Sequence, residues 1–185
     1  MGRGVAFKLA DSPSEFRQIE RLNYQTFVEE IPQHPPNPSR RLRDARHEKN
    51  AYVVAKMGAR VAGMLALNME RPFSLDAKLA DLDSLVPSEG ARLCEIRLLA
   101  IAPEFRKGKI LLGLMRHVVF YALDNRVDFI LISGTTRETP MYLKLGFEAF
   151  HPPVGSEGAV FVPMILDVLK PEAQKWKKLD SCRGL

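Results

Sequence analysis

Two strongly apolar segments, 93–103 (LCEIRLLAIAP) and 127–134 (VDFILISG), flank a segment with helical periodicity, 106–126. Apolar runs of this length, bounded by turn residues, predict strands. Between the first strand and the helix the chain passes through a basic turn that contains Gly108 and offers no capping Ser or Asp. The sequence therefore predicts a strand that runs through a basic turn into a helix and then into a second buried strand.

Local signals predict an alternating order of elements in the rest of the chain. Ser12 and Glu15 form a capping box, with Pro13 at the first helical position. Four prolines in 32–41 predict a loop. The predicted elements are a strand at 5–10, a helix ending at Pro32, a short polar helix before Asn50, a hairpin of 51–57 and 61–68 around Gly58, a loop at 69–91 with room for one helical turn, a helix at 137–145, and closing strands from 148 to 169.

Length and composition predict one globular domain, residues 1–170, followed by a basic tail, 171–185. The chain has 185 residues, of which 46% are hydrophobic and 26% charged. It has no long uncharged apolar run and no secretory signal, so we expect no membrane span and a cytoplasmic protein. Cys94 and Cys182 predict neither a disulfide nor a metal pair. The net charge of +5 favours an anionic partner.

The strand at 93–103 carries charges in an apolar setting. Alternation places Glu95, Arg97, Leu99 and Ile101 on one face. Two charges beside two large apolar side chains are more typical of the wall of a cleft than of core or plain solvent-facing surface.

The basic turn predicts an anion site. The first amides of a helix have no internal partner, and the helix dipole favours negative charge there. Arg106, Lys107 and Lys109 surround Gly108. The turn is therefore a candidate cradle for a phosphate or pyrophosphate.

A second motif, TPMYLKLGF (139–147), places Tyr142 on a short helix four residues before Gly146. Together, CEIRLLAIAPEFRKGKI and TPMYLKLGF resemble motifs A and B of the GNAT superfamily of N-acyltransferases. The resemblance implies an α/β (α+β) fold, with a mixed, mostly antiparallel, splayed β-sheet flanked by helices. It also implies transfer of an acyl group from acyl-CoA to a primary amine by direct attack, with no metal.

The resemblance assigns roles to residues. Tyr142 would protonate the departing thiolate, and Glu95 would take a proton from the attacking ammonium, directly or through water, best with a raised pKa. Backbone groups of Leu99, Ala100 and Ile101 would pair with the pantetheine arm. The phosphates would be held at the turn, by Arg106, Lys107, Gly108, Lys109, Ile110 and Leu111.

The turn departs from the family pattern, because its glycine lies one place early and Lys109 and Leu111 replace small residues. The segment RLNYQTFVEE (21–30), with the arginine-rich loop and hairpin after it, is similar to the autoinducer synthases and N-acyl amino acid synthases. That branch implies an acyl-carrier protein as alternative donor and partner, docked by arginines 40–46 or the basic tail through salt-sensitive contacts. Its products would be N-acyl amino acids or acyl-homoserine lactone-like compounds.

Other interpretations remain open. Tyr142 fits an ordinary half-buried tyrosine, and Glu95 fits a structural ion pair with Arg97 or Arg92. The altered turn fits a thioester-binding module without catalysis, and the basic charge fits a nucleic-acid-binding domain, which we regard as the weakest alternative because Trp176 is the only aromatic residue among the tail lysines. The sequence does not identify the amine acceptor, the acyl chain length or the oligomeric state.

Overall fold

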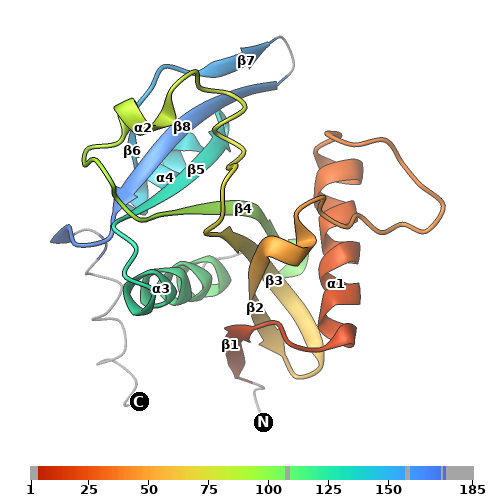
Figure 1. Ribbon diagram of the computed structural model, residues 1–185. Coiled ribbons are helices and arrows are strands. Elements are labelled where there is room, and N and C mark those ends of the chain that lie inside the picture. The colour runs from red at the N-terminus through yellow and green to blue at the C-terminus, as the bar shows by residue number, and fades with distance from the viewer. Residues whose placement is uncertain (1–3, 107–108, 157–158, 172, 174–185) are drawn as a thin grey trace. The chain divides into compact units, whose positions relative to one another are not determined.

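The computed structural model describes residues 4–106, 109–156, 159–171 and 173 (Figure 1). Within them the chain forms two compact units, the first from residues up to 67 and 98–117, the second from 68–97 and 118 onward. In hydrogen-bonding order the strands run β1-β2-β3-β4-β5-β8-β6, with β7 on β8. No helix among the described residues has the length and apolar character needed to cross a bilayer.

The first unit contains the predicted strand, helix and hairpin of the N-terminal half. Strand β1 pairs antiparallel with β2, from Val5 opposite Met57 to Leu9 opposite Val53. The hairpin turns at Gly58, whose φ of +63° is accessible to glycine without steric cost. The elements of this unit are β1 (Val5–Leu9), α1 (Pro13–Tyr24), η1 (Gln25–Glu30), η2 (His47–Lys49), β2 (Asn50–Met57), β3 (Arg60–Asn68), η3 (Pro103–Phe105), the end of β4 (Leu93–Ile101) and the start of α3 (Lys109–Asp124).

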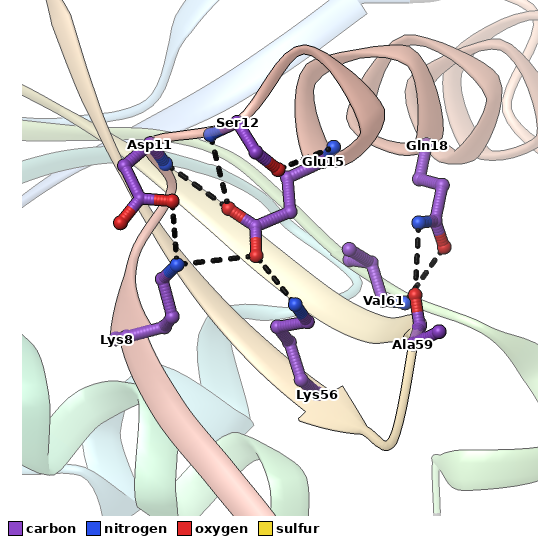
Figure 2. Close-up of polar contacts among 8 residues, drawn as sticks. All are labelled: Lys8, Asp11, Ser12, Glu15, Gln18, Lys56, Ala59 and Val61. Atoms are coloured by element: carbon purple, nitrogen blue, oxygen red, sulfur yellow. Dashed lines mark hydrogen bonds and ion pairs between the residues drawn. The ribbon is translucent and has the colours of Figure 1, made fainter.

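The start of α1 confirms the predicted capping box. The Glu15 amide donates to Ser12 Oγ at 3.3 Å, and Glu15 Oε2 accepts from the Asp11 and Ser12 amides at 3.0 and 3.4 Å. The other oxygen, Glu15 Oε1, forms ion pairs with Lys56 Nζ at 2.6 Å and Lys8 Nζ at 3.2 Å (Figure 2). Burial alone would raise the pKa of Glu15, but these hydrogen bonds, with that from Lys56 the strongest, lower it to about 2.

The predicted first helix does not stay α-helical up to Pro32. The α-helix ends at Tyr24, and the next six residues form the π-helical turn η1. The Ile31 amide donates to the Thr26 carbonyl, five residues back, at 2.9 Å. A π-helical hydrogen bond spans one residue more than an α-helical one, and such turns often occur at functional sites.

A hydrophobic cluster holds the first unit together. Ile19 and Leu22 of α1 pack with the fully buried Val54 and Met64 of the hairpin. Gln18 adds a polar link to the hairpin turn, since its amide donates to the Ala59 carbonyl at 3.0 Å and accepts from the Val61 amide at 2.9 Å (Figure 2).

The second unit holds the mixed part of the sheet. The start of β4 pairs parallel with β5, and β5 pairs antiparallel with β8 over seven residues, which lie side by side in Figure 1. The predicted mixed, mostly antiparallel sheet is confirmed. The elements of this unit are α2 (Leu82–Leu85), the start of β4, the end of α3, β5 (Phe129–Thr135), α4 (Thr139–Lys144), β6 (Glu148–Ala149), β7 (Val154–Ser156) and β8 (Ala159–Asp167).

The segment 69–91 contributes more to the core than its loop-like sequence predicts. It has one short helix, α2, as the sequence allowed. Phe73 and Leu75 are 2% and 0% exposed and pack with Leu131 of β5 and Ile165 of β8. The segment therefore covers one face of the sheet in this unit.

The cluster around Glu15 predicts an acid-sensitive contribution to stability. Replacing Glu15 with Gln removes charged hydrogen bonds at a buried helix start, so we expect a loss of about 1–3 kcal/mol of unfolding free energy at neutral pH. Because the pKa of Glu15 is lowered from 4.5 to about 2, this stabilisation is present above 4.5 and is lost as the pH falls toward 2. Urea unfolding of both proteins across this range measures the difference.

Glu48→Gln is the matched control. Glu48 pairs with Arg43 but is 83% exposed, so its replacement should change stability by less than about 0.5 kcal/mol. A Glu15→Gln protein as stable as the control variant at neutral pH would contradict the assignment.

Candidate active site

The end of β4 in the first unit contains a backbone irregularity. Leu98 has a φ of +55°, which a branched, non-glycine residue rarely adopts. Regular strand alternation is interrupted at this residue, so the predicted face shared by Glu95, Arg97, Leu99 and Ile101 cannot be extended beyond Arg97. Ala100 is buried, whereas Leu99 and Ile101 are half-buried.

The turn after β4 is a 3-10 helix, η3, followed by the exposed Arg106. The Arg106 Nε donates to the Ile101 carbonyl at 2.9 Å, and its guanidinium pairs with Glu30 at the end of η1. Lys107 and Gly108, two of the predicted phosphate-binding residues, lie outside the described residues. The Arg106 side chain is thus used to fasten the turn to β4 and η1.

The described part of α3 begins at Lys109, and Arg106, where the predicted helix starts, lies in the preceding turn. The two residues between them lie outside the described residues. Lys109 is exposed, Ile110 is 4% exposed, and Leu111 is half-buried. The amides at the start of a helix have no partner within the helix. The buried Ile110 side chain holds the helix start in place, while the exposed Lys109 places a cation beside these amides.

Gly63 of β3 explains how closely this helix start approaches the strands. A Cβ at Gly63 would lie 2.7 Å from Ile110 Cγ2 and 3.2 Å from Ile101 Cγ1. A Cβ this close would force the Ile110 side chain to shift, so the absence of a side chain at Gly63 permits the observed packing. Sequence reasoning missed Gly63, because an isolated glycine in a strand does not reveal which residue it touches.

Tyr142 lies in the second unit, on α4, and is 6% exposed. Its ring packs against Gly134 of β5, where a Cβ would lie 2.7 Å from Tyr142 Cε2. Phe147 makes an edge contact, with ring centroids 5.9 Å apart. Burial, and secondarily the charge of Glu138, raise the pKa of Tyr142 above its usual value of 10.0, so the phenol stays protonated at neutral pH.

Glu95, on the part of β4 that belongs to the second unit, is fully buried. Its carboxylate accepts from the Ser74 amide at 2.9 Å, Ser74 Oγ at 2.5 Å and the Leu75 amide at 3.2 Å. Arg97 Nε lies 3.8 Å away, which agrees with the alternative of a structural ion pair. Glu95 therefore fixes the start of the segment that covers the sheet.

Lys78 was missed by sequence reasoning, because an isolated lysine in a loop carries no signal. Its Nζ donates to Ser133 Oγ at 2.7 Å and lies 4.1 Å from the centroid of the Phe161 ring. Burial lowers the pKa of Lys78, the charge of Glu95 opposes this shift, and Arg97 adds to it. Lys78 thus places a half-buried ammonium beside β5 and β8.

Three of the four arginines at 40–46 pair with acidic side chains. Arg40 pairs with Glu29 at 2.5 Å, Arg41 lies 3.9 Å from Glu20, and Arg43 pairs with Glu48 at 2.5 Å. Among the described residues no group of three or more metal-ligating side chains occurs.

Comparison with known proteins decides the family. The family model described as N-acyl amino acid synthase FeeM matches residues 18–168. The chain belongs to the FeeM family of N-acyl amino acid synthases. It is therefore an enzyme of the acyltransferase class, and the predicted kinship with this branch is confirmed. A comparison with curated proteins finds no match.

Solved structures confirm the N-acyltransferase fold. The CoA-dependent acyl-homoserine lactone synthase BjaI, solved with SAM and isopentyl-CoA, is 20% identical, with a TM-score of 0.81, over 98% of this chain and 92% of its own. FeeM from uncultured soil microbes is 16% identical, with a TM-score of 0.66, over 95% and 93%. An acyl-CoA N-acyltransferase from Pseudomonas aeruginosa is 13% identical, with a TM-score of 0.62, over 88% and 99%.

The contact between Gly134 and Tyr142 predicts a coupled pair of substitutions. Gly134→Ala forces the ring out of place, so we expect a destabilisation of about 1–3 kcal/mol. In a Tyr142→Ala background the obstacle is gone, and the same change should cost less than about 0.5 kcal/mol. Urea unfolding of the four proteins gives the coupling energy. Gly4→Ala, where no atom lies within 4 Å of the new Cβ, is the neutral control.

An equal cost of Gly134→Ala in both backgrounds would contradict this placement of the Tyr142 ring.

Proposed function

We propose that this member of the FeeM family transfers an acyl group from acyl-CoA to the amino group of an amino acid. The observation that carries the proposal is the family match over residues 18–168, which spans both compact units. BjaI, solved with isopentyl-CoA, supports CoA as the donor carrier. In this proposal residues 1–170 act as one acyltransferase domain, with 171–185 as a basic tail.

The donor's phosphates are assigned to the turn in the first unit. Lys109, Ile110 and Leu111 supply backbone amides at the start of α3, which favours a bound anion. Lys107 and Gly108 belong to the same proposed set. Arg106 contributes by holding the turn to the Ile101 carbonyl, and the backbone of Leu99, Ala100 and Ile101 is assigned to the pantetheine arm.

Tyr142 is the proposed acid. The acceptor nitrogen attacks the thioester carbonyl carbon, a C–N bond forms, the C–S bond breaks, and the departing thiolate takes the Tyr142 proton. The nitrogen loses a proton to solvent or to a base, and the phenolate then regains one from solvent. Tyr142 holds its proton at neutral pH, as this role requires, although burial raises its pKa and makes the phenol a weaker acid.

Glu95 remains the proposed base, acting through water. Its carboxylate is fully buried and already accepts three hydrogen bonds from Ser74 and Leu75, so we assign proton transfer from the acceptor to a route through water. We assign Glu95 first to holding this segment in place, and proton removal is its second proposed role.

An acyl-carrier protein remains the alternative donor. The arginines at 40–46 and the basic tail were its alternative predicted docking sites. Three of these arginines are paired with glutamates of this chain, and nearly all of the tail lies outside the described residues. Those exposed pairs would have to open before a carrier could bind there, at a small energetic cost.

Replacing Tyr142 with Phe tests the proposed acid. The ring is kept and only the hydroxyl is lost, so kcat for CoA release in the presence of amino acids should fall about 100-fold or more. The dissociation constant for acyl-CoA, measured by calorimetry, should change less than about threefold. Tyr121→Phe, a second tyrosine of the same unit, should leave both values unchanged.

An unchanged kcat in the Tyr142→Phe protein would remove the acid role. Acyl-CoA that is neither bound nor consumed by the wild-type protein would remove CoA as the donor.

A further inference from the structure

The ammonium of Lys78 uses only part of its hydrogen-bonding capacity within the protein. It has three N–H donors, one of which is used by the neutral Ser133 hydroxyl, at 2.7 Å. A second neighbour is the Phe161 ring, which attracts a cation but provides no counter-charge. Within the described ranges, no carboxylate lies within ion-pairing distance of Lys78.

This arrangement has an energetic cost. Withdrawing an ammonium from water without an anionic partner is unfavourable, and the lowered pKa of Lys78, caused first by burial, reflects it. Glu95 attracts Lys78 only at longer range, since its described hydrogen bonds come from Ser74 and Leu75 and not from the ammonium. The site therefore favours an anion supplied from outside.

The backbone holds the lysine in place. Glu95 binds the amides of Ser74 and Leu75, and the turn continues with hydrogen bonds from the Lys78 and Leu79 amides to the Leu75 carbonyl, at 3.0 and 2.9 Å. A side chain anchored at both its backbone and its tip loses little further freedom when an anion binds.

Lys78 and Tyr142 contact neighbouring residues of β5, within the same unit. Its partner Ser133 directly precedes Gly134, the residue against which the Tyr142 ring packs. Because successive side chains of a strand point to opposite faces, the Lys78 ammonium and the Tyr142 ring approach these neighbouring residues of β5 from opposite faces of the sheet.

We propose that Lys78 binds the carboxylate of the acceptor amino acid. The inference rests on the proposed function, in which an amino acid is the acceptor. An amino acid carries its carboxylate one carbon away from the nucleophilic nitrogen, so one anchored ammonium can orient the amine. The donor's phosphates are assigned to the turn in the first unit, which leaves the acceptor's carboxylate as the anion for Lys78. Lys78 is a positioning and specificity residue, since it takes no part in bond making.

The test compares acids with amines that lack the carboxylate. The wild-type protein is first assayed with acyl-CoA and each standard amino acid, and the best acceptor is paired with its decarboxylated amine. We expect the wild-type kcat/KM to favour the acid by about tenfold or more. Lys78→Met, which keeps the apolar contact with Phe161, should reduce kcat/KM for the acid about ten- to hundredfold, mainly through KM, and change that for the amine less than about threefold.

Lys144→Met is the matched control, because Lys144 is an exposed lysine of the same unit. It should retain the wild-type preference, whereas Lys78→Arg should recover part of it. The acyl-CoA dissociation constant and the circular dichroism spectrum of each variant report on folding.

Three outcomes overturn the proposal. A Lys78→Met protein that keeps the wild-type preference for the acid over the amine shows that Lys78 does not bind the carboxylate. A wild-type protein with equal kcat/KM for the acid and the amine shows that the acceptor's carboxylate is not recognised at all. A wild-type protein that acylates amines but no amino acid removes the proposed function together with this inference, so the two failures can be told apart.

Discussion

The buried carboxylate of Glu95 is the constraint on which the second unit depends. A buried charge is tolerated only when its oxygens are hydrogen-bonded, and here three donors come from two consecutive residues, Ser74 and Leu75. This fixes the start of the segment 69–91 on β4. Phe73 and Leu75 then complete the core above β5 and β8, and Lys78 reaches Ser133. One charged side chain thus determines where an otherwise irregular segment lies.

In the first unit the position of the helix start depends on a steric constraint. The absence of a side chain at Gly63 lets Ile110 seat the start of α3 against β3 and β4. Arg106 then fastens the turn to the Ile101 carbonyl and to Glu30. The family's small residues are replaced by Lys109 and Leu111, so the proposed phosphate site depends on backbone amides and added positive charge. That this turn binds an anion stays a prediction, because Lys109 and Leu111 depart from the pattern of the GNAT motif.

Signals close together in the sequence were predicted well. The capping box at Ser12 and Glu15 and the hairpin at Gly58 were anticipated, because each depends on neighbouring residues or on apolar periodicity. The mixed, mostly antiparallel sheet was anticipated from the resemblance to the GNAT motifs. The segment 21–30, with the arginine-rich loop and hairpin after it, led to the correct family, and the two GNAT-like motifs led to the correct fold. The roles of Tyr142, Glu95 and the turn residues stay predictions until they are measured.

Features that depend on contacts distant in sequence were not predictable. The positive φ of Leu98 interrupts an alternation that the sequence alone presents as regular. The π-helical turn at Gln25–Glu30 has the same apolar pattern as the α-helix before it. Lys56 meets Glu15, and Lys78 meets Ser133, across 41 and 55 residues, and no local pattern announces either contact.

Product analysis tests the central claim most directly. The protein is incubated with acyl-CoA and uniformly ¹⁵N-labelled amino acids, and the products are examined by tandem mass spectrometry. The account predicts an amide that carries the acyl group on the labelled nitrogen, formed in step with free CoA. Release of CoA with only free fatty acid, or no consumption of the thioester under conditions where it binds, would contradict it.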